Sequence, residues 1–342
     1  SLDVTNARAS FANKDAGQDK TVTFTGFALS GAKSSNYTLS TQPSSSKANI
    51  TPKIVTIDGI TAKDKIYDGN SAATLAMPII TTEMGIVTGD NLTADAYGYF
   101  RSKDADSNIT VDIAGITLFG ADAGNYILTA AGNQSTAIAG ITPKAIIVTP
   151  NTLSKNVGQD DPPLSYTHSE PAPDETASFT GTLSRTAGET AGSYPLNIGT
   201  LALVDNGAFK IVNYELELSA TTVNLTIFKA SQSPVFFANA ATINKTYGDA
   251  SFTLPAVSGG SGTGANSYRS DNEAVATVSD NVVTIHGAGE AKIYVKKLGD
   301  ADYKDSAEAS VTIKIARIPL TISGVTTNNK TYDGNTAAPM DA

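Results

Sequence analysis

The chain has 342 residues and a formal net charge of −9, and it contains no cysteine, no tryptophan and only two histidines. Without cysteine it can form no disulfide, no thiol nucleophile and no cysteine-ligated metal site. Its acidic balance argues against nucleic-acid binding, because phosphates attract a basic surface. Residues 145–148 form the longest aliphatic run, and a membrane-spanning helix needs ~20 apolar residues, so we expect no membrane insertion.

Short bursts of alternating apolar and polar residues recur along the whole chain. A two-residue period is typical of a strand with one buried face, and Gly-, Asn- and Asp-rich turn clusters separate the bursts. No stretch shows the sustained spacing of an amphipathic helix. The pattern therefore predicts an all-β chain of antiparallel sandwiches. The clearest bursts lie at residues 21–25, 109–113, 214–218, 223–227, 292–296 and 311–315.

The chain matches itself at two fixed offsets, which reveals a modular organisation. Residues 11–16 recur as 100–105, 89 positions later, and residues 56–70 recur as 321–335, 265 positions later. We interpret residues 54–144 as one complete module, 1–53 as the C-terminal part of a similar module, and 316–342 as the N-terminal part of another. Residues 145–229 and 230–315 form the two remaining modules.

Tyrosines mark equivalent positions in these modules. A Lys-x-Tyr turn lies near the start of most modules, although Val157 replaces the tyrosine in the third, and an Asn-Tyr or Asp-Tyr pair lies late in each. A buried ring whose hydroxyl binds nearby backbone is a device of sandwich folds, so we predict a structural role. Carbohydrate stacking is the alternative. The motif tyrosines are Tyr37, Tyr67, Tyr126, Tyr214, Tyr247, Tyr303 and Tyr332.

Three segments resemble known families. Residues 54–144, with Lys65-Ile66-Tyr67-Asp68-Gly69, resemble a YDG domain. Residues 145–229 resemble an MBG domain through the motifs at 158–162, 179–185, 188–194 and 213–214. Residues 230–315 are similar to bacterial immunoglobulin-like modules through 270–278, 287–289 and 302–303. The resemblance implies immunoglobulin-like sandwiches in large bacterial surface or secreted proteins, often adhesin-like, and it brings no ligand-binding residue set.

No catalytic arrangement emerges from the sequence. His168 and His286 are the only histidines, and neither accompanies a Gly-x-Ser-x-Gly nucleophile motif. We therefore expect no enzyme activity, no catalytic residues and no cofactor.

Calcium is the one metal that the acidic loops suggest. Asp104 and Asp106 lie in one such loop, and Asp300 and Asp302 lie in another. Calcium takes six to eight oxygen ligands, whereas each loop supplies about three. Turn-forming aspartates have the same spacing, and we adopt that interpretation, with calcium as the alternative.

The junctions between modules are short. Pro52 and Pro143 stand at the ends of the first two modules, where one predicted strand runs almost directly into the next. Proline fixes φ and holds its predecessor extended, and no flexible Gly/Ser linker intervenes. We predict an elongated rod with small contacts between successive modules.

These observations predict a non-enzymatic stalk or adhesive repeat segment of a bacterial cell-surface or secreted adhesin-like protein. The expected location is extracellular, and the expected partner is an unknown surface ligand or another copy of the chain. One alternative is a self-assembling structural subunit of an extracellular fibre or sheath. Another is a set of accessory modules of a large secreted enzyme.

The two ends of the chain motivate the self-assembly alternative. Without a signal peptide or initiator methionine at Ser1, we expect an excised piece of a longer chain. Residues 1–53 and 316–342 each lack part of a sandwich, so both should expose apolar strand faces. We therefore include head-to-tail strand complementation between copies as a hypothesis.

Overall fold

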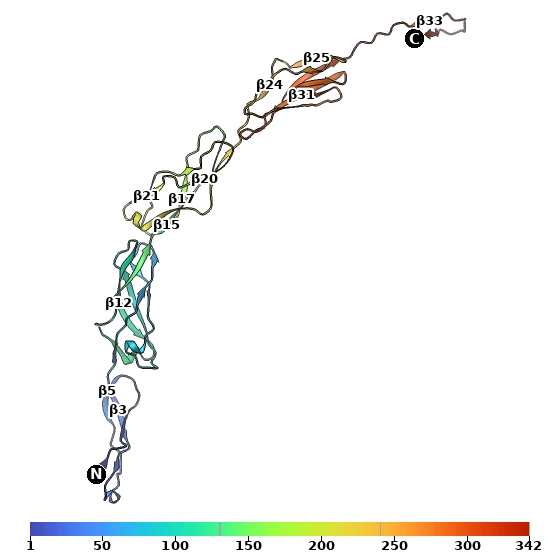
Figure 1. The fold of residues 1–342 in the computed structure, drawn as a ribbon. Helices are drawn as coiled ribbons and strands as arrows, with labels where there is room; N and C mark the ends of the chain where they lie inside the picture. The colour runs from blue at the N-terminus through green and yellow to red at the C-terminus, as the bar shows by residue number, and fades with distance from the viewer. Residues whose placement is uncertain (130, 240, 342) are drawn as a thin grey trace. The chain divides into compact units, whose positions relative to one another are not determined.

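The computed structural model describes residues 1–129, 131–239 and 241–341, and these residues are all-β (Figure 1). They form 34 strands and four single-turn 3-10 helices, with no α-helix in the described ranges. The sequence prediction of an all-β chain is confirmed.

The chain forms two compact units. The first comprises residues 1–148, 168–181 and 201–218, and the second comprises 149–167, 182–200 and 219–342. The predicted third module, residues 145–229, therefore contributes to both units.

The N-terminal piece consists of a three-stranded antiparallel sheet, β2-β3-β5, and a two-stranded sheet, β1-β4. Val22 is its one buried hydrophobic side chain among the described residues. The elements are β1 (Leu2–Asp3), β2 (Arg8–Phe11), β3 (Gly17–Thr25), β4 (Ala28–Leu29), η1 (Ser34–Asn36) and β5 (Ser46–Ile50).

Residues 54–144 build a five-stranded sheet in the order β8-β14-β12-β11-β9, faced by the small sheets β13-β6 and β10-β7. Over residues 109–113, strand β12 buries the alternate side chains Ile109, Val111 and Ile113, as the sequence alternation predicts. The elements are β6 (Lys53–Val55), β7 (Thr61–Ala62), β8 (Lys65–Ile66), β9 (Ala72–Ala73), β10 (Leu75–Ala76), η2 (Thr82–Met84), β11 (Thr93–Phe100), β12 (Asp106–Phe119), η3 (Ala123–Asn125), β13 (Tyr126–Leu128) and β14 (Thr136–Thr142).

The following segment contains the sheets β17-β15-β22, β16-β23-β20-β19 and β18-β21. Strand β15 runs parallel to β22, and β16 runs parallel to β23. The elements are β15 (Lys144–Pro150), β16 (Leu153–Asn156), β17 (Tyr166–His168), β18 (Phe179–Thr180), β19 (Ser184–Arg185), β20 (Gly192–Asn197), β21 (Ala202–Leu203), η4 (Ile211–Asn213), β22 (Tyr214–Leu218) and β23 (Asn224–Phe228).

Residues 230–316 fold around the sheets β25-β32-β31-β28, β26-β30-β29 and β24-β27. The alternating residues of β31 and β32, including Ile293 and Ile313, fill their common core. The elements are β24 (Val235–Phe237), β25 (Thr242–Thr246), β26 (Phe252–Thr253), β27 (Val257–Gly259), β28 (Asn266–Ser270), β29 (Ala276–Ser279), β30 (Val282–Ile285), β31 (Gly289–Lys297) and β32 (Ala309–Ala316).

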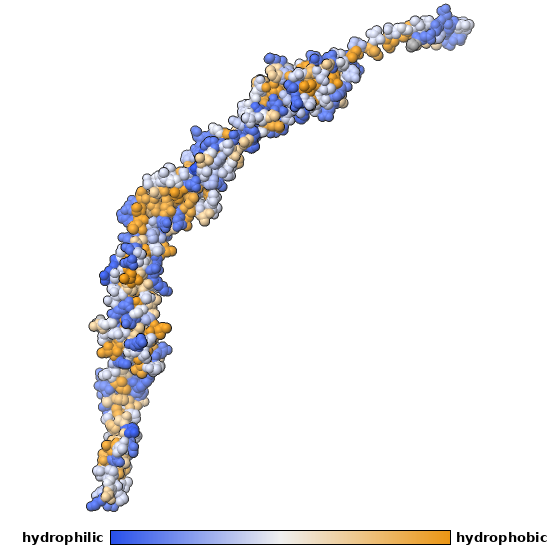
Figure 2. Space-filling view, viewed as in Figure 1, coloured by the Kyte–Doolittle hydropathy of each residue, from blue (hydrophilic) through white to orange (hydrophobic). Residues whose placement is uncertain are grey.

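The C-terminal piece carries one hairpin, in which β33 (Thr326–Thr327) pairs with β34 (Met340–Asp341). Its described residues from 318 onward are exposed, and the apolar ones lie on the surface of the tail (Figure 2).

Candidate functional site

The late Asn-Tyr pairs share one backbone geometry. Each of the helices η1, η3 and η4 ends on the asparagine of the pair, and the next residue is an extended tyrosine. The φ and ψ angles of Tyr37, Tyr126 and Tyr214 agree closely, at −133° and 152°, −130° and 157°, and −137° and 150°. In the fourth segment, the Asp300 carboxylate binds the backbone amides of Asp302 and Tyr303 instead, both at 3.0 Å.

In three of the late pairs the tyrosine is buried or half-buried, namely Tyr126, Tyr214 and Tyr303. In each of these pairs, the side chain before the tyrosine binds the backbone amide of an alanine in the preceding segment. Asn125 Oδ1 accepts a hydrogen bond from the Ala16 amide at 2.7 Å, and Asn213 Oδ1 accepts one from the Ala105 amide at 2.7 Å. Asp302 Oδ1 accepts the equivalent bond from the amide of Ala191 at 3.2 Å. Each alanine stands directly before the first residue of a strand, respectively β3, β12 and β20. We call this contact the alanine-amide lock.

A parallel strand pairing accompanies each lock. Tyr126 pairs with Lys53, the first residue of β6, and Tyr214 pairs with Lys144, the first residue of β15. An isolated parallel bridge joins Tyr303 to Ala230 in the same way. Two backbone features thus recur at these three junctions: the bound alanine amide and a parallel pairing of the tyrosine with the start of the next segment.

The Tyr126 hydroxyl is bound on both sides. It donates to Asp90 at 2.7 Å and accepts from the Val87 amide at 2.9 Å, and the ring is 7% exposed. Lys14 of the N-terminal piece lies 2.6 Å from Asp90. Hydrogen bonds from Lys14 and Tyr126 lower the pKa of the Asp90 carboxyl, whereas burial raises the pKa of Tyr126. Lys14 therefore adds a salt bridge to the first lock.

Two tyrosines share one buried carboxylate at the second lock. The hydroxyls of Tyr67 and Tyr214 donate to Glu175 at 2.6 and 2.9 Å, and Lys103 lies 3.7 Å from the same side chain. The Tyr214 hydroxyl also accepts from the Ala172 amide at 2.9 Å. Burial raises the pKa of Tyr214 to about 12, and burial with the Glu175 bond raises the pKa of Tyr67 as well.

The core at this lock is larger than the sequence predicted. We expected small contacts between modules, but the rings of Tyr67 and Tyr214 meet edge to face at 5.4 Å, and Phe209 stacks on Tyr214 at 4.4 Å. These rings belong to one hydrophobic cluster that also contains Phe100 and Ile146. Module 54–144 and the segment after it therefore share a core within the first unit, because aromatic side chains from both sides of the junction point into the same space.

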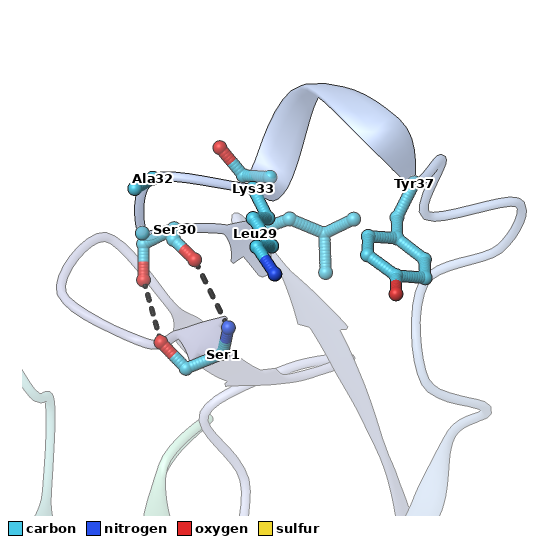
Figure 3. Close-up of a pocket in the computed structure, with 8 residues that line it drawn as sticks. Ser1, Leu29, Ser30, Ala32, Lys33 and Tyr37 are labelled. Carbon is cyan, nitrogen blue, oxygen red and sulfur yellow. Dashed lines mark hydrogen bonds between the residues drawn. The ribbon is translucent and has the colours of Figure 1, made fainter.

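The other motif tyrosines differ from the predicted buried ring. Tyr303 is half-buried, and Tyr247 is 48% exposed. Tyr37 and Tyr332 are 72% and 94% exposed, whereas Tyr126 and Tyr67 at the equivalent positions are 7% and 2% exposed. Figure 3 shows the Tyr37 ring beside Leu29 at a pocket that Ser1, Ser30 and Lys33 also line.

Hydrogen bonds within the protein occupy the aspartates that were calcium candidates. Asp104 accepts from the Asn213 side chain at 2.9 Å, and Asp106 accepts from the Asn108 amide at 3.1 Å. Asp302 forms the third lock, and Asp300 accepts from the Thr263 amide at 2.6 Å. Hydrogen bonds from the backbone amides of Thr263, Asp302 and Tyr303 lower the pKa of the Asp300 carboxyl to about 2. Across residues 1–129, 131–239 and 241–341, no group of three His, Cys, Asp or Glu side chains gathers in metal-binding geometry.

The two histidines lie apart from these contacts. The His168 ring lies 4.9 Å from Phe179, and its Nδ1 is 3.0 Å from the Ser169 carbonyl oxygen. His286 Nε2 is 2.8 Å from the Thr277 hydroxyl. Neither arrangement positions a nucleophile with an acid.

Sequence reasoning missed the locked alanines and an ion cluster around the buried Lys155. Ala16, Ala105 and Ala191 share one position in their repeats, a signal that the internal comparison contains for the first two. In the second unit, Lys155 is 7% exposed, 2.7 Å from Asp161 and bonded to Glu189 at 2.5 Å. Arg185 lies 2.6 Å from Asp161. The hydrogen bonds that Arg185 and Lys155 donate to the Asp161 carboxylate lower its pKa to about 2.

Comparisons with known proteins identify two domains. A family model described as the YDG domain matches residues 1–45 and 51–137, and one described as the MBG domain (YGX type) matches residues 146–224. A search of curated proteins found no match. In the described part of the chain, no helix has the length and hydrophobicity to cross a membrane.

A search of solved structures found distant similarities. Drosophila N-cadherin EC1-3 is 9% identical, with 75% of this chain and 98% of that chain covered and a TM-score of 0.20. Domains 1–6 of the surface layer protein SbsC are 13% identical, with coverage of 91% and 46% and a TM-score of 0.22. A SusE-like surface located polysaccharide binding protein from Bacteroides thetaiotaomicron is 9% identical, with coverage of 92% and 54% and a TM-score of 0.20.

Proposed function

Because the chain carries a YDG domain and an MBG domain in tandem, we propose that it is a non-enzymatic stalk or adhesive repeat segment. Its parent is a bacterial cell-surface or secreted protein of adhesin type, and its location is extracellular. The chain holds a binding part away from a surface or contributes weak contacts along its length. Families of this kind, which the sequence resembles, supply that expectation.

The alanine-amide lock is the observation that carries the stalk role. It occurs three times, at Ala16, Ala105 and Ala191, with an asparagine or aspartate acceptor each time. A side chain that binds a backbone amide fixes the distance between two segments without depending on the partner's side chain. A repeated fixed contact suits a chain that transmits force along a series of modules.

Single-molecule force spectroscopy tests the stalk role. We pull the whole chain between its ends and expect separate unfolding events, one of which releases the 86 residues of 230–315, about 30 nm of chain at ~3.5 Å per residue. Asn213→Ala should lower the force at which the first unit opens, whereas the exposed Asn197→Ala should not. Smooth extension without steps would contradict a stalk. Turnover of a glycan or peptide substrate would contradict a non-enzymatic role.

A structural subunit of an extracellular fibre or sheath is the second candidate function. The exposed apolar side chains of residues 1–53 and 316–341 favour it, because a partner can cover an exposed apolar strand face. Leu320 is 90% exposed and Tyr37 is 72% exposed, whereas a core would normally bury such residues.

A further inference from the structure

The outer face of the main sheet in residues 54–144 carries two neighbouring exposed tyrosines, and we propose that this face binds an extended, neutral polysaccharide. Tyr97 and Tyr99 of β11 stack on the sugar rings, while Arg101 and Asp112 beside them bind the sugar hydroxyls. This inference rests on the adhesive part of the function proposed above and gives it a ligand class and a site. The site lies wholly within the first unit.

Strand β11 places the two tyrosines on one side of the sheet. Gly98 and Phe100 are buried, whereas Tyr97 and Tyr99 are 67% and 51% exposed. Side chains two residues apart on an antiparallel strand point the same way and lie about 6.8 Å apart along it. The two rings therefore form a short row along β11. A row of rings suits a ligand whose own flat units repeat in one direction.

A β-bulge in the neighbouring strand holds the Tyr97 ring. The pairing of β11 with β12 shifts register between Asp95 and Tyr97, and Gly115 of β12 has a φ of 66° opposite this shift. A β-carbon at Gly115 would lie 2.9 Å from the Tyr97 ring, so the ring rests on bare backbone. Bulges with a left-handed glycine re-aim side chains. A ring that is already held in place loses little entropy when a ligand stacks on it.

A charged pair lies next to the rings. Asp112 of β12 is directly opposite Tyr99, and Arg101 donates to Asp112 Oδ1 from Nε at 3.0 Å and from Nη2 at 2.7 Å. The Arg101 and Asp112 side chains are 59% and 50% exposed. A guanidinium has five N–H donors and a carboxylate about four acceptor sites, so both groups keep capacity for a ligand. Sugar hydroxyls donate and accept, and this pair offers both partners.

The charges on this face select a neutral ligand. Hydrogen bonds from Arg101 lower the pKa of the Asp112 carboxyl, so at neutral pH both groups are ionised and the pair has no net charge. Asp95 is exposed on the same side of β11 and adds a negative charge. An anionic polymer therefore meets no excess of positive charge here.

The area of the two rings favours a sugar chain over a protein partner. Two aromatic side chains bury at most about 500 Å², whereas a stable protein interface buries about 800 Å² on each partner. Polar side chains lie beside the rings, since Asp112 is opposite Tyr99 on one side and opposite Thr136 on the other. A pyranose ring matches this surface because it has apolar C–H faces and a rim of hydroxyls.

The fold does not require tyrosines at these positions. Strand β2 matches β11 at the offset of 89, and the two strands pair with β3 and β12 in the same register. Arg8 and Ser10 of β2 stand where β11 has Tyr97 and Tyr99. The same strand pair thus forms without the rings, so sheet formation alone does not explain two exposed aromatic side chains.

Titration calorimetry of the whole chain with cellohexaose, a straight and uncharged hexasaccharide, is the first test. We expect binding, and Tyr97→Ala and Tyr99→Ala should each weaken it at least about tenfold because each removes one stacking ring. Tyr97→Phe/Tyr99→Phe keeps both rings and should bind within about threefold of the wild type. Tyr247→Ala is the matched control at an exposed tyrosine of the second unit and should leave binding unchanged.

Salt and a charged polymer test the ligand class. Cellohexaose binding should change less than about twofold between about 0.05 and 0.5 M salt, because salt screens net charges and the Arg101–Asp112 pair has none. An anionic oligogalacturonate of the same length should bind at least about tenfold more weakly. A preference for oligogalacturonate would overturn the proposal and make Arg101 an anion site.

Saturation-transfer NMR and thermal melts separate stacking from a structural role. Saturation should reach the C–H protons of cellohexaose in the wild type and be lost in Tyr97→Ala/Tyr99→Ala. Both single alanine variants should melt like the wild type because the rings are exposed. If Tyr97→Ala lowered the melting temperature and bound cellohexaose normally, the ring would serve only to cover Gly115, and the proposal would be wrong.

Three further results would overturn the proposal. They are no cellohexaose binding by the wild type, equal binding by Tyr97→Ala/Tyr99→Ala, and self-association that this double variant abolishes, which would make a second copy the occupant. A chain that binds no sugar but unfolds in discrete steps under force would reject this site and leave the stalk function standing. Smooth extension by a chain that binds cellohexaose through these tyrosines would do the reverse.

Discussion

At the scale of single residues, the tyrosines combine packing with hydrogen bonding. Tyr214 is 5% exposed, stacks on Phe209 and places its hydroxyl between Glu175 and the Ala172 amide. A phenol suits this position because its ring fills apolar space while its hydroxyl donates one of the hydrogen bonds that the buried Glu175 carboxylate accepts.

Truncation of Tyr214 should destabilise the first unit. Tyr214→Ala removes a buried ring and should cost ~3–5 kcal/mol of unfolding free energy, whereas Tyr214→Phe should cost ~1–3 kcal/mol because it leaves Glu175 short of a donor. Because the two segments share one core, we expect Tyr214→Ala to destabilise module 54–144 as well as the segment that contains Tyr214. Denaturant unfolding with hydrogen-exchange readout measures both. If Tyr214→Ala melted like the wild type and lost glycan binding, the ring would be a ligand platform.

Tyr126 is the equivalent buried tyrosine at the first lock. Tyr126→Ala removes a ring that contacts the core around Ile57 and leaves Asp90 without one donor. We expect ~3–5 kcal/mol of destabilisation. The exposed Tyr97→Ala is the control, since its ring is 67% exposed. Equal losses for the two variants would contradict the anchoring role.

The raised tyrosine pKa values predict alkaline sensitivity. In the unfolded chain Tyr214 ionises near pH 10, but its pKa in the folded protein is about 12. Its contribution to stability is therefore fully present below about pH 10 and is lost as the pH rises from there to about 12. Thermal melts between pH 8 and 12 should show a smaller decline for Tyr67→Phe/Tyr214→Phe. An unchanged slope in the double variant would refute this source of the pH dependence.

At the scale of elements, the junction consists of a turn, an entering strand and an amide. The η3 and η4 turns fix the asparagine, and the strands β6 and β15 fix the tyrosine beside it. The acceptor binds main chain, so asparagine and aspartate both serve, as the third lock shows with Asp302.

Asn213 is the position at which this arrangement can be measured. Its side chain is fully buried, accepts from Ala105 and donates to Asp104 at 2.9 Å. Asn213→Ala should cost ~1–3 kcal/mol, because it leaves the half-buried Ala105 amide without its acceptor and removes the donor to Asp104. Asn125→Asp keeps the acceptor of the first lock and should stay within ~1 kcal/mol of the wild type. Calorimetry measures the unfolding free energy of both variants. Equal losses of stability would show that the lock does not depend on a side-chain hydrogen-bond acceptor.

At the scale of the whole molecule, the rod remains a prediction that rests on the short junctions at Pro52 and Pro143. A single compact body of this length would have a radius of gyration of about 20 Å. We expect small-angle scattering to give a value well above that figure and a distance distribution with a long tail. A radius near 20 Å would show that the modules collapse on one another.

The sequence alone determined the strands and their repetition. A two-residue alternation states which face of a strand is buried, so the cores at Val111, Ile293 and Ile313 could be predicted residue by residue. The fixed offsets of 89 and 265 predict one complete module and two partial ones, because similar sequences are expected to form similar strands. The Asn-Tyr pairs also followed from comparison of the repeats.

Only the tertiary structure decided what those pairs contact. Asn125 and Ala16 are 109 residues apart, and Tyr67 and Glu175 are 108 apart, so no local pattern could connect them. The acceptor of each tyrosine hydroxyl depends on which loop folds over the ring, which alternation does not encode. Burial likewise depends on neighbouring strands: Tyr37 and Tyr126 share sequence and backbone angles, but only the strands around residues 54–144 cover the ring.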